Sequence, residues 1–143
     1  MQIFLASDHA GYALKQQVIA FLQQQNFTTI DLGCDSAESA VDYPDFAHKL
    51  AKNLQNSQDF GILICGSGIG ISISANRHPH IRAALCHNAK LAKLARAHNN
   101  ANVLCLGARV VTNKTAINIV KNFLKQPFEA GRHVIRVNKI NNQ

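Results

Sequence analysis

The chain reads Ile62-Leu63-Ile64-Cys65-Gly66-Ser67-Gly68-Ile69-Gly70-Ile71-Ser72, an apolar run followed by a cysteine and then by three glycines at alternate positions. This pattern predicts a buried strand, a tight turn and a short helix from residue 71 to about 76. Backbone N–H groups at such a turn attract an anion, and the helix dipole adds to the attraction. A thiol beside the turn can be reactive. The stretch therefore predicts a nucleophile or base next to an anion cradle, although a structural turn with a buried cysteine shows the same pattern.

Apolar runs alternate with helical patterns along the rest of the chain. We expect strands at residues 3–6, 28–32, 61–64, 82–86 and 103–106. We expect helices at residues 12–25, 44–54, 71–76, 89–97, 112–125 and 131–141, and a loop at 33–43. This alternation predicts an α/β fold, a Rossmann-like three-layer α/β/α sandwich with a five-stranded parallel sheet. Ligands of such folds bind at the carboxyl ends of the strands.

Length and composition indicate one domain, covering residues 1–143. No apolar run approaches the roughly 20 residues of a membrane span, and the N-terminus lacks the basic region of a signal peptide. We therefore expect a cytoplasmic protein that does not bind membranes. None of the four cysteines forms a C-x-x-C pair, which disfavours a zinc or thioredoxin-type site. Cys86 and Cys105 lie in apolar segments and are predicted to be core residues.

Positive charge is concentrated in the second half of the chain. The formal net charge is +7, and the span from Phe60 to Phe128 contains nine lysines and arginines but no acidic residue. Such a field favours an anionic ligand, either a small phosphate or a nucleic acid. For the helical lysines, Lys90, Lys93, Lys121 and Lys125, we favour a solvated basic surface instead.

Polar residues flank two of the predicted strands, the first and the fifth. Asp8 and His9 follow the first strand, where Asp8 can cap a helix, contact a ligand or do both. His98 and Asn99 precede the fifth strand, and a histidine there can act as a general acid or base. Arg109 directly follows the fifth strand.

Arg132 and Arg136 are four residues apart, so a helix would place both on one face. Two guanidinium groups on one face can grip a phosphate, although they also fit a basic helix surface. The candidate residues include no carboxylate cluster for Mg²⁺ and no zinc set. We therefore expect metal-free proton transfer on a small phosphorylated substrate, without a cofactor.

These motifs together resemble the ribose-5-phosphate isomerase B family, which also includes the isomerases of galactose 6-phosphate and allose 6-phosphate. The matching segments cover nearly the whole chain in order; they are 7–11, 42–44, 65–74, 75–77, 96–99, 102–104 and 131–133. Some members of this family use a glutamate six residues after the cysteine position as the base. The corresponding residue here is Ile71, which places this chain among the members that use a cysteine.

The resemblance implies interconversion of D-ribose 5-phosphate and D-ribulose 5-phosphate through an enediolate. Cys65 would be the base, Ser67 the hydroxyl beside it, and His98 the acid/base that opens the sugar ring. Substrate oxygens and the phosphate would contact Asp8, His9, Gly66, Ser67, Gly68, Ile69, Gly70, Asn99, Arg109, Arg132 and Arg136. The resemblance also implies a homodimer or a dimer of dimers, with sites at the subunit interface.

Three other functions compete with this prediction. A six-carbon sugar phosphate differs by one hydroxymethyl unit, which a pocket discriminates by only about 1–3 kcal/mol. A nucleotide-binding module is disfavoured because the loop reads G-x-G-x-G, and no acidic residue follows it before Glu129. A nucleic-acid-binding protein is disfavoured because no aromatic residues are interleaved with the basic ones.

Overall fold

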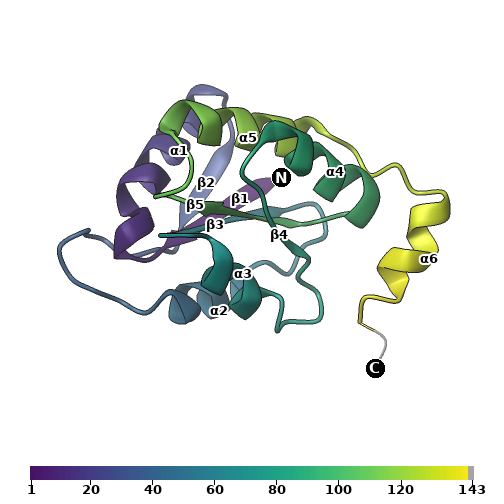
Figure 1. The fold of residues 1–143 in the computed structure, drawn as a ribbon, viewed down its shortest axis with the longest axis horizontal. Helices are drawn as coiled ribbons and strands as arrows, with labels where there is room; N and C mark the ends of the chain where they lie inside the picture. Colours follow the sequence, from purple (N-terminus) through teal and green to yellow (C-terminus); the bar gives the residue numbers. More distant parts are fainter. Residues whose placement is uncertain (142–143) are drawn as a thin grey trace.

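Five parallel strands form the centre of the structure, a computed structural model that describes residues 1–141 (Figure 1). The spatial order is β2-β1-β3-β5-β4. The strands are β1 (Gln2–Ser7), β2 (Thr28–Asp31), β3 (Phe60–Cys65), β4 (Ala83–Leu85) and β5 (Val103–Gly107). After β1 the chain adds β2 on one side of it and then returns to add β3 on the other side. This reversal opens a crevice at the carboxyl ends of β1 and β3.

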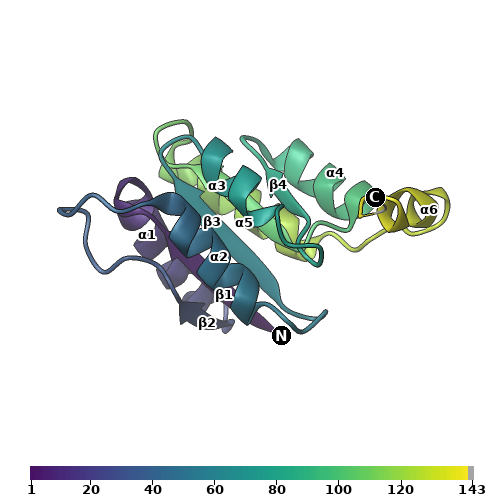
Figure 2. The ribbon, with the colours of Figure 1, turned by 90° about the horizontal axis from the view of Figure 1, so that it is seen from below.

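Helices cover both faces of the sheet, as the alternating pattern predicts (Figure 1). One layer contains α1 (Tyr12–Gln24), α4 (Ala89–Asn99) and α5 (Asn113–Lys125). The other contains α2 (Tyr43–Asn53) and α3 (Ile69–Ala75). A short 3-10 helix, η1 (His9–Gly11), joins β1 to α1. The last helix, α6 (Arg132–Asn138), stands beyond the end of α4, away from both layers (Figures 1 and 2).

The two layers pack on opposite sides of each central strand because successive strand residues point to opposite faces. Ile62 and Ile64 of β3 join the core under α1, α4 and α5, whereas Leu63 and Cys65 join the core under α2 and α3. Cys105 of β5 belongs to the second core as well. Burial raises the pKa of the Cys105 thiol, and burial raises that of Cys86 to about 11. Both cysteines are therefore core residues, as predicted.

Some boundaries differ from the predicted ones. Helix α3 begins at Ile69, two residues early, because the left-handed turn at Gly68 lets the helix start directly after it. Strand β4 covers only Ala83–Leu85. Helix α6 ends at Asn138, three residues before the predicted end. Within residues 1–141, no helix combines the length and the apolar composition that crossing a membrane requires.

One buried lysine is not evident from the sequence. Lys15 lies on the inner face of α1 with 0% of its surface exposed. Its Nζ lies 2.7 Å from each carboxylate oxygen of Asp31 and donates a third hydrogen bond to the carbonyl of Cys34 at 2.9 Å. An ion pair to a group this buried stabilises the fold only when such additional hydrogen bonds are present. Lys15 therefore ties the end of β2 and the following loop to α1.

Candidate active site

A cavity of about 660 Å³ opens at the carboxyl end of the sheet, where β1, β3 and β5 end. The following residues line it: Asp8, Tyr43, Cys65, Gly66, Ser67, Ile69, Gly70, Ile73, Arg109 and Val110. Seven of these ten belong to the predicted site. The cavity lies at the point where the strand order reverses, the usual ligand position in open α/β sheets.

Cys65 lies at the floor of this cavity as the last residue of β3, with 4% of its surface exposed. The backbone N–H of Gly68 donates a hydrogen bond to its Sγ at 3.1 Å. The left-handed conformation of Gly68 (φ = 79°) makes this contact possible. A Cβ at this position would lie 2.5 Å from Leu85 Cδ1 and 2.8 Å from the carbonyl carbon of Leu106. Glycine is therefore required for the turn that positions the sulfur.

The glycine-rich loop differs in one respect from the predicted anion cradle. The N–H of Ile69 donates to the hydroxyl of Ser67 at 3.2 Å, in addition to the bond from Gly68 to the sulfur. Two N–H groups of the turn are therefore satisfied within the chain. The N–H groups of Gly70 and Ile71 follow in the first turn of α3, where a helix leaves its donors unpaired.

Asp8 and Arg109 place opposite charges on the cavity wall. The Asp8 carboxylate is 6% exposed and accepts a hydrogen bond from the N–H of Gly11 at 3.0 Å, which confirms its capping role. The N–H of Arg109 donates to the carbonyl of Gly66 at 3.0 Å. A Cβ on Gly66 would lie 3.3 Å from Arg109 Nη1, so the guanidinium lies against this glycine. The cavity thus offers one cation and one carboxylate beside the thiol.

His9 does not line this cavity. Its Nδ1 accepts a hydrogen bond from the N–H of Val41 at 3.2 Å. The ring therefore holds the loop between β2 and α2 against η1. A contact between His9 and a substrate stays a prediction.

The second half of the predicted site lies at the other end of the sheet. His98 and Asn99 are the last two residues of α4, just before β5 begins at Val103. β5 is parallel to β3, and its last residue, Gly107, pairs with Cys65. Four steps of about 3.3 Å separate the two ends of β5, roughly 13 Å along the strand alone. A single chain therefore does not bring His98 and Cys65 into one cavity.

Arg132 and Arg136 also lie at that other end, on α6. Both are exposed, and their four-residue spacing within one helix is as predicted. His133 lies between them in sequence but is buried, and its ring stacks on that of His98. Burial and the neighbouring His98, Arg132 and Arg136 lower the pKa of His133, whereas Glu129 opposes that effect.

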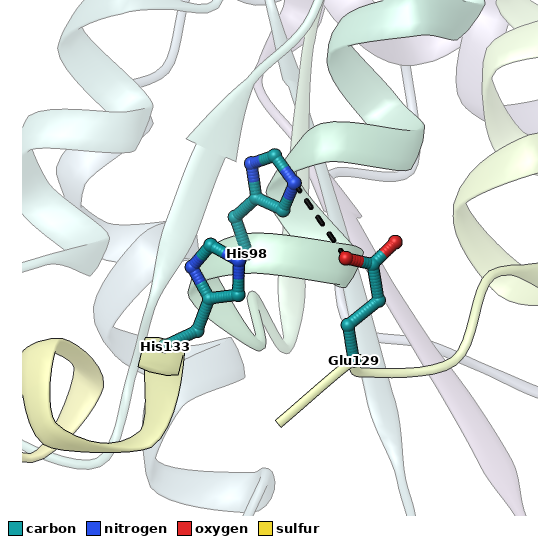
Figure 3. A group of neighbouring side chains, drawn as sticks. All are labelled: His98, Glu129 and His133. Carbon is teal, nitrogen blue, oxygen red and sulfur yellow. Dashed lines mark ion pairs between the residues drawn. The ribbon is translucent and has the colours of Figure 1, made fainter. Parts of the chain in front are cut away.

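His98, His133 and Glu129 form a compact group at the junction of α4 and α6 (Figure 3). The two imidazole rings stack with centroids 4.4 Å apart and planes 10° from parallel. Glu129 Oε2 lies 3.8 Å from His98 Nε2. The sequence prediction gave neither His133 nor Glu129 a role at this position.

The ligand atoms of this group lie within 4.8 Å of one another, which is close enough to consider a metal ion. A metal bound by histidine lies near the plane of each ring, about 2.0–2.1 Å from the nitrogen. Two parallel stacked rings direct their nitrogen lone pairs in separate planes, so these lone pairs do not converge on one point. The arrangement therefore does not fit a metal ion unless a ring turns.

Exposed apolar side chains mark both halves of the site. Ile69, Ile73 and Val110 line the cavity at Cys65 and are exposed. On and after α6, the exposed apolar side chains are Val134, Ile135 and Ile140. Clustered exposed apolar side chains often belong to protein–protein interfaces.

Comparison with known proteins gives consistent matches over almost the whole chain. A sequence model of the Ribose/Galactose Isomerase family matches residues 3–140. Ribose-5-phosphate isomerase B of Escherichia coli is 42% identical over 140 residues, covering 97% of this chain and 93% of that protein.

Solved structures match equally well. The ribose 5-phosphate isomerase from Thermotoga maritima superimposes with a TM-score of 0.96 at 45% identity, covering 99% of this chain and 98% of that one. The ribose-5-phosphate isomerase B of Mycoplasma genitalium, solved with bound ribulose-5-phosphate, gives a TM-score of 0.92 at 46% identity. That match covers 98% of this chain and 93% of the other.

Proposed function

The chain belongs to the ribose/galactose isomerase family, and from that premise we propose that it interconverts D-ribose 5-phosphate and D-ribulose 5-phosphate. The observation that carries the proposal is the position of the Cys65 thiol at the floor of a cavity that Asp8 and Arg109 also line. A base, a polar anchor for sugar oxygens and a cation for the phosphate are what this reaction needs. We propose that residues 1–143 act as one domain.

In the proposed mechanism, the Cys65 thiolate removes the proton from C2 of the open-chain aldose. The resulting enediolate accepts that proton at C1, while a proton passes from O2 to O1, so the product is the ketose and nothing is oxidised or reduced overall. Ser67 Oγ lies on the same loop and is directed by the N–H of Ile69. We assign it the orientation of the substrate oxygens beside the base. Asp8 accepts hydrogen bonds from sugar hydroxyls.

The enediolate carries negative charge and needs donors already in position. In comparable sites the loss of one such donor costs about 3–4 kcal/mol of transition-state stabilisation. The unpaired N–H groups at the start of α3 and the Arg109 guanidinium supply positive potential at the cavity. The residues from Gly66 to Gly70 thereby take part in substrate binding through their backbone.

We further propose that the site is completed by a second copy of the chain. His98, Asn99, Arg132 and Arg136 lie too far from Cys65 within one chain, as the strand geometry shows. A twofold dimer brings the α4–α6 end of one chain to the Cys65 cavity of the other and creates two equal sites. The exposed apolar residues at both places would then be buried. His98 would open the sugar ring in the neighbouring chain's cavity.

Mixed dimers test both proposals. Cys65→Ala and His98→Asn variants, each inactive on cyclic ribose 5-phosphate, are co-expressed with different tags. Random pairing makes half of the dimers mixed, and each mixed dimer has one intact site, so activity returns to about one quarter of wild type. The control pairs Cys65→Ala with Cys65→Ser, which gives no recovery. No recovery in the first pair would place both residues in one chain's site, and an inactive wild type would reject the isomerase itself.

We propose that the reaction uses neither a metal nor a cofactor. The one group of three ligand-type residues found within residues 1–141 has parallel histidine rings that do not converge on an ion. Dialysis against EDTA should leave the rate unchanged. A loss of activity that Zn²⁺ restores would overturn this part of the mechanism.

Activity assays test the alternative that the substrate is a six-carbon sugar phosphate. Parallel assays with ribose 5-phosphate, allose 6-phosphate and galactose 6-phosphate should give the highest kcat/KM for ribose 5-phosphate. A higher value for either hexose phosphate would change the substrate but not the chemistry. We also propose a cytoplasmic location, since all four cysteines are free, as a reducing compartment favours.

A further inference from the structure

A second cavity, of about 280 Å³, lies at the amino ends of β3, β4 and β5. We call it the amino-end pocket and define it by Arg82, Arg96, Asn100, Asn56 and Ser57, which all line it. His98, Asn99, Arg132 and Arg136 do not line it, nor does any residue of the Cys65 cavity. The mechanism proposed above gives this pocket no role.

Two arginines are held side by side in this pocket by one residue. Arg82 Nε donates to the backbone carbonyl of Asn100 at 2.8 Å, and Arg96 Nη1 donates to the side-chain oxygen of Asn100 at 2.9 Å. Asn100 adopts a left-handed conformation (φ = 46°) at the end of α4, which asparagine tolerates better than most residues. The two guanidinium groups are thus fixed in position before any ligand arrives.

Neither arginine has a carboxylate partner within residues 1–141. Burial lowers the pKa of both arginines, and the charge of Arg82 lowers that of Arg96 further. Arg96 is only 9% exposed, and its Nε is enclosed without an acceptor. Two positive charges beside one another, partly removed from water and unpaired, destabilise the fold unless something compensates them.

Part of this arrangement has a structural explanation. The Arg96 guanidinium lies 4.7 Å from the ring centre of Phe60 and 5.8 Å from that of Phe123, and its Nη1 also donates to the carbonyl of Ala101. These contacts stabilise a cation at the end of α4. They do not explain Arg82, whose two terminal nitrogens donate to no other group in the described chain.

Other polar groups of the pocket can donate hydrogen bonds. The Ser57 hydroxyl has no hydrogen-bond partner among residues 1–141, and Asn56 uses only its oxygen, which accepts from the N–H of Gln58 at 3.0 Å. Arg96 Nη2 is also unpaired there and, unlike Nε, is not enclosed. No aspartate or glutamate lines the pocket. Several free donors with two fixed positive charges complement an oxyanion.

We propose that the amino-end pocket binds a small phosphate-bearing anion, either inorganic phosphate or a short phosphate monoester. Its volume of about 280 Å³ lies at the lower limit of small-molecule pockets, roughly 300 Å³, and suits a small anion. The guanidinium fork of Arg82 matches two phosphate oxygens. This site is separate from the phosphate position at Arg109, at the other end of the strands, and it does not depend on the proposed isomerase activity.

Calorimetric titration with inorganic phosphate tests the proposal. Wild type should show two sites per chain, and Arg82→Gln should lose one of them, with affinity weakened about tenfold or more. Lys121→Gln, which removes one exposed charge on α5, is the matched control and should keep both. Inhibition of isomerisation by phosphate reports the substrate site alone and should be unchanged in Arg82→Gln. The same number of sites and the same affinities in wild type and Arg82→Gln would overturn the proposal.

A second variant tests the proposal even if Arg82→Gln does not fold. Asn56→Asp keeps the shape and the oxygen that accepts from Gln58, and residue 56 is exposed. Its new carboxylate should pair with the arginines and repel phosphate, again weakening that site about tenfold. Far-UV circular dichroism should match wild type. Unchanged phosphate binding in this folded variant would contradict the proposal independently.

Discussion

The two ends of the sheet carry different kinds of chemistry. At the carboxyl end, Cys65, Asp8 and Arg109 share one cavity, and backbone N–H groups hold the sulfur and the neighbouring hydroxyl. At the amino end, arginines and histidines lie on α4, on α6 and in the amino-end pocket, and exposed apolar side chains surround α6. The residues that line the Cys65 cavity all come from one chain. The residues of α4 and α6 lie far from that cavity in their own chain, so they have no base beside them.

This difference shows how a parallel sheet distributes functional residues. Loops that follow strands meet at the carboxyl end, whereas residues that precede a strand are carried to the opposite end. A small domain that needs both groups in one site can obtain them from two copies of itself.

The largest effect is expected at the carboxyl end. Cys65→Ala should lower kcat about a thousandfold or more, because a positioned general base contributes roughly 10²–10⁴. Binding of phosphate should stay near wild type, since Arg109 is untouched. Steady-state kinetics with ribose 5-phosphate measures the loss, and substantial remaining kcat would remove Cys65 from the role of base.

Alkylation provides a control for that variant. Iodoacetamide should inactivate wild type, and substrate should protect it. Mass spectrometry should find the label on Cys65 and not on Cys86 or Cys105, whose pKa values burial raises. Inactivation with the label on either core cysteine would indicate unfolding instead.

An effect nearly as large, but limited to one direction, is expected at the amino end. His98→Asn should lower the rate on cyclic ribose 5-phosphate about a hundredfold, within the usual range for an acid/base residue. Activity on ribulose 5-phosphate, an open-chain ketose, should be retained. Initial rates measured in both directions decide, because equal losses would give His98 a part in the enediolate step as well.

The third prediction concerns stability at the carboxyl end. Lys15→Met removes the buried cation and leaves the Asp31 carboxylate, which is 37% exposed, without its partner. The cost of breaking a buried pair is about 3–5 kcal/mol, and partial hydration of Asp31 should reduce it to roughly 2 kcal/mol. Urea denaturation measures the change, and Lys49→Met on the exposed face of α2 is the control. Equal stability of both variants would show that Lys15 contributes only packing.

The smallest effect is expected on α6. Arg136→Ala should weaken kcat/KM for ribose 5-phosphate about tenfold, roughly 1.4 kcal/mol, because a phosphate contact positions the substrate. Arg136→Lys should recover only part of it, since lysine lacks the planar fork. Competitive inhibition by inorganic phosphate should weaken in parallel. Changes below about twofold for both Arg132→Ala and Arg136→Ala would indicate a basic surface and not a phosphate clamp.

Much of the fold was predictable because its signals are local. Apolar runs and helical periodicity predict all five strands and six helices with small errors at their ends. The start of α3 was less predictable, since it depends on how Gly68 packs against Leu85 and Leu106, which are distant in sequence. Lys15 was not predictable, because a lysine on an apolar helix face is normally assigned to the surface.

The candidate site divides in the same way. Cys65, Ser67, Asp8 and Arg109 were predictable as neighbours because each lies at the carboxyl end of a strand. His98 precedes its strand, so the same rule places it at the opposite end of the sheet. No local sequence signal indicates that a second chain would bring it to Cys65. Tyr43 and Val110 line the cavity without any chemical signature that would single them out.

The contact between Gly70 and Tyr43 constrains how this family can vary. A Cβ at position 70 would lie 2.6 Å from the hydroxyl oxygen of Tyr43, so even alanine displaces that ring from the cavity wall. The ring is the outer part of a half-exposed side chain and can swing away, so the fold tolerates the change but the cavity does not keep its shape. Positions 43 and 70 should therefore change together among relatives, with a smaller residue at 43 wherever 70 is not glycine.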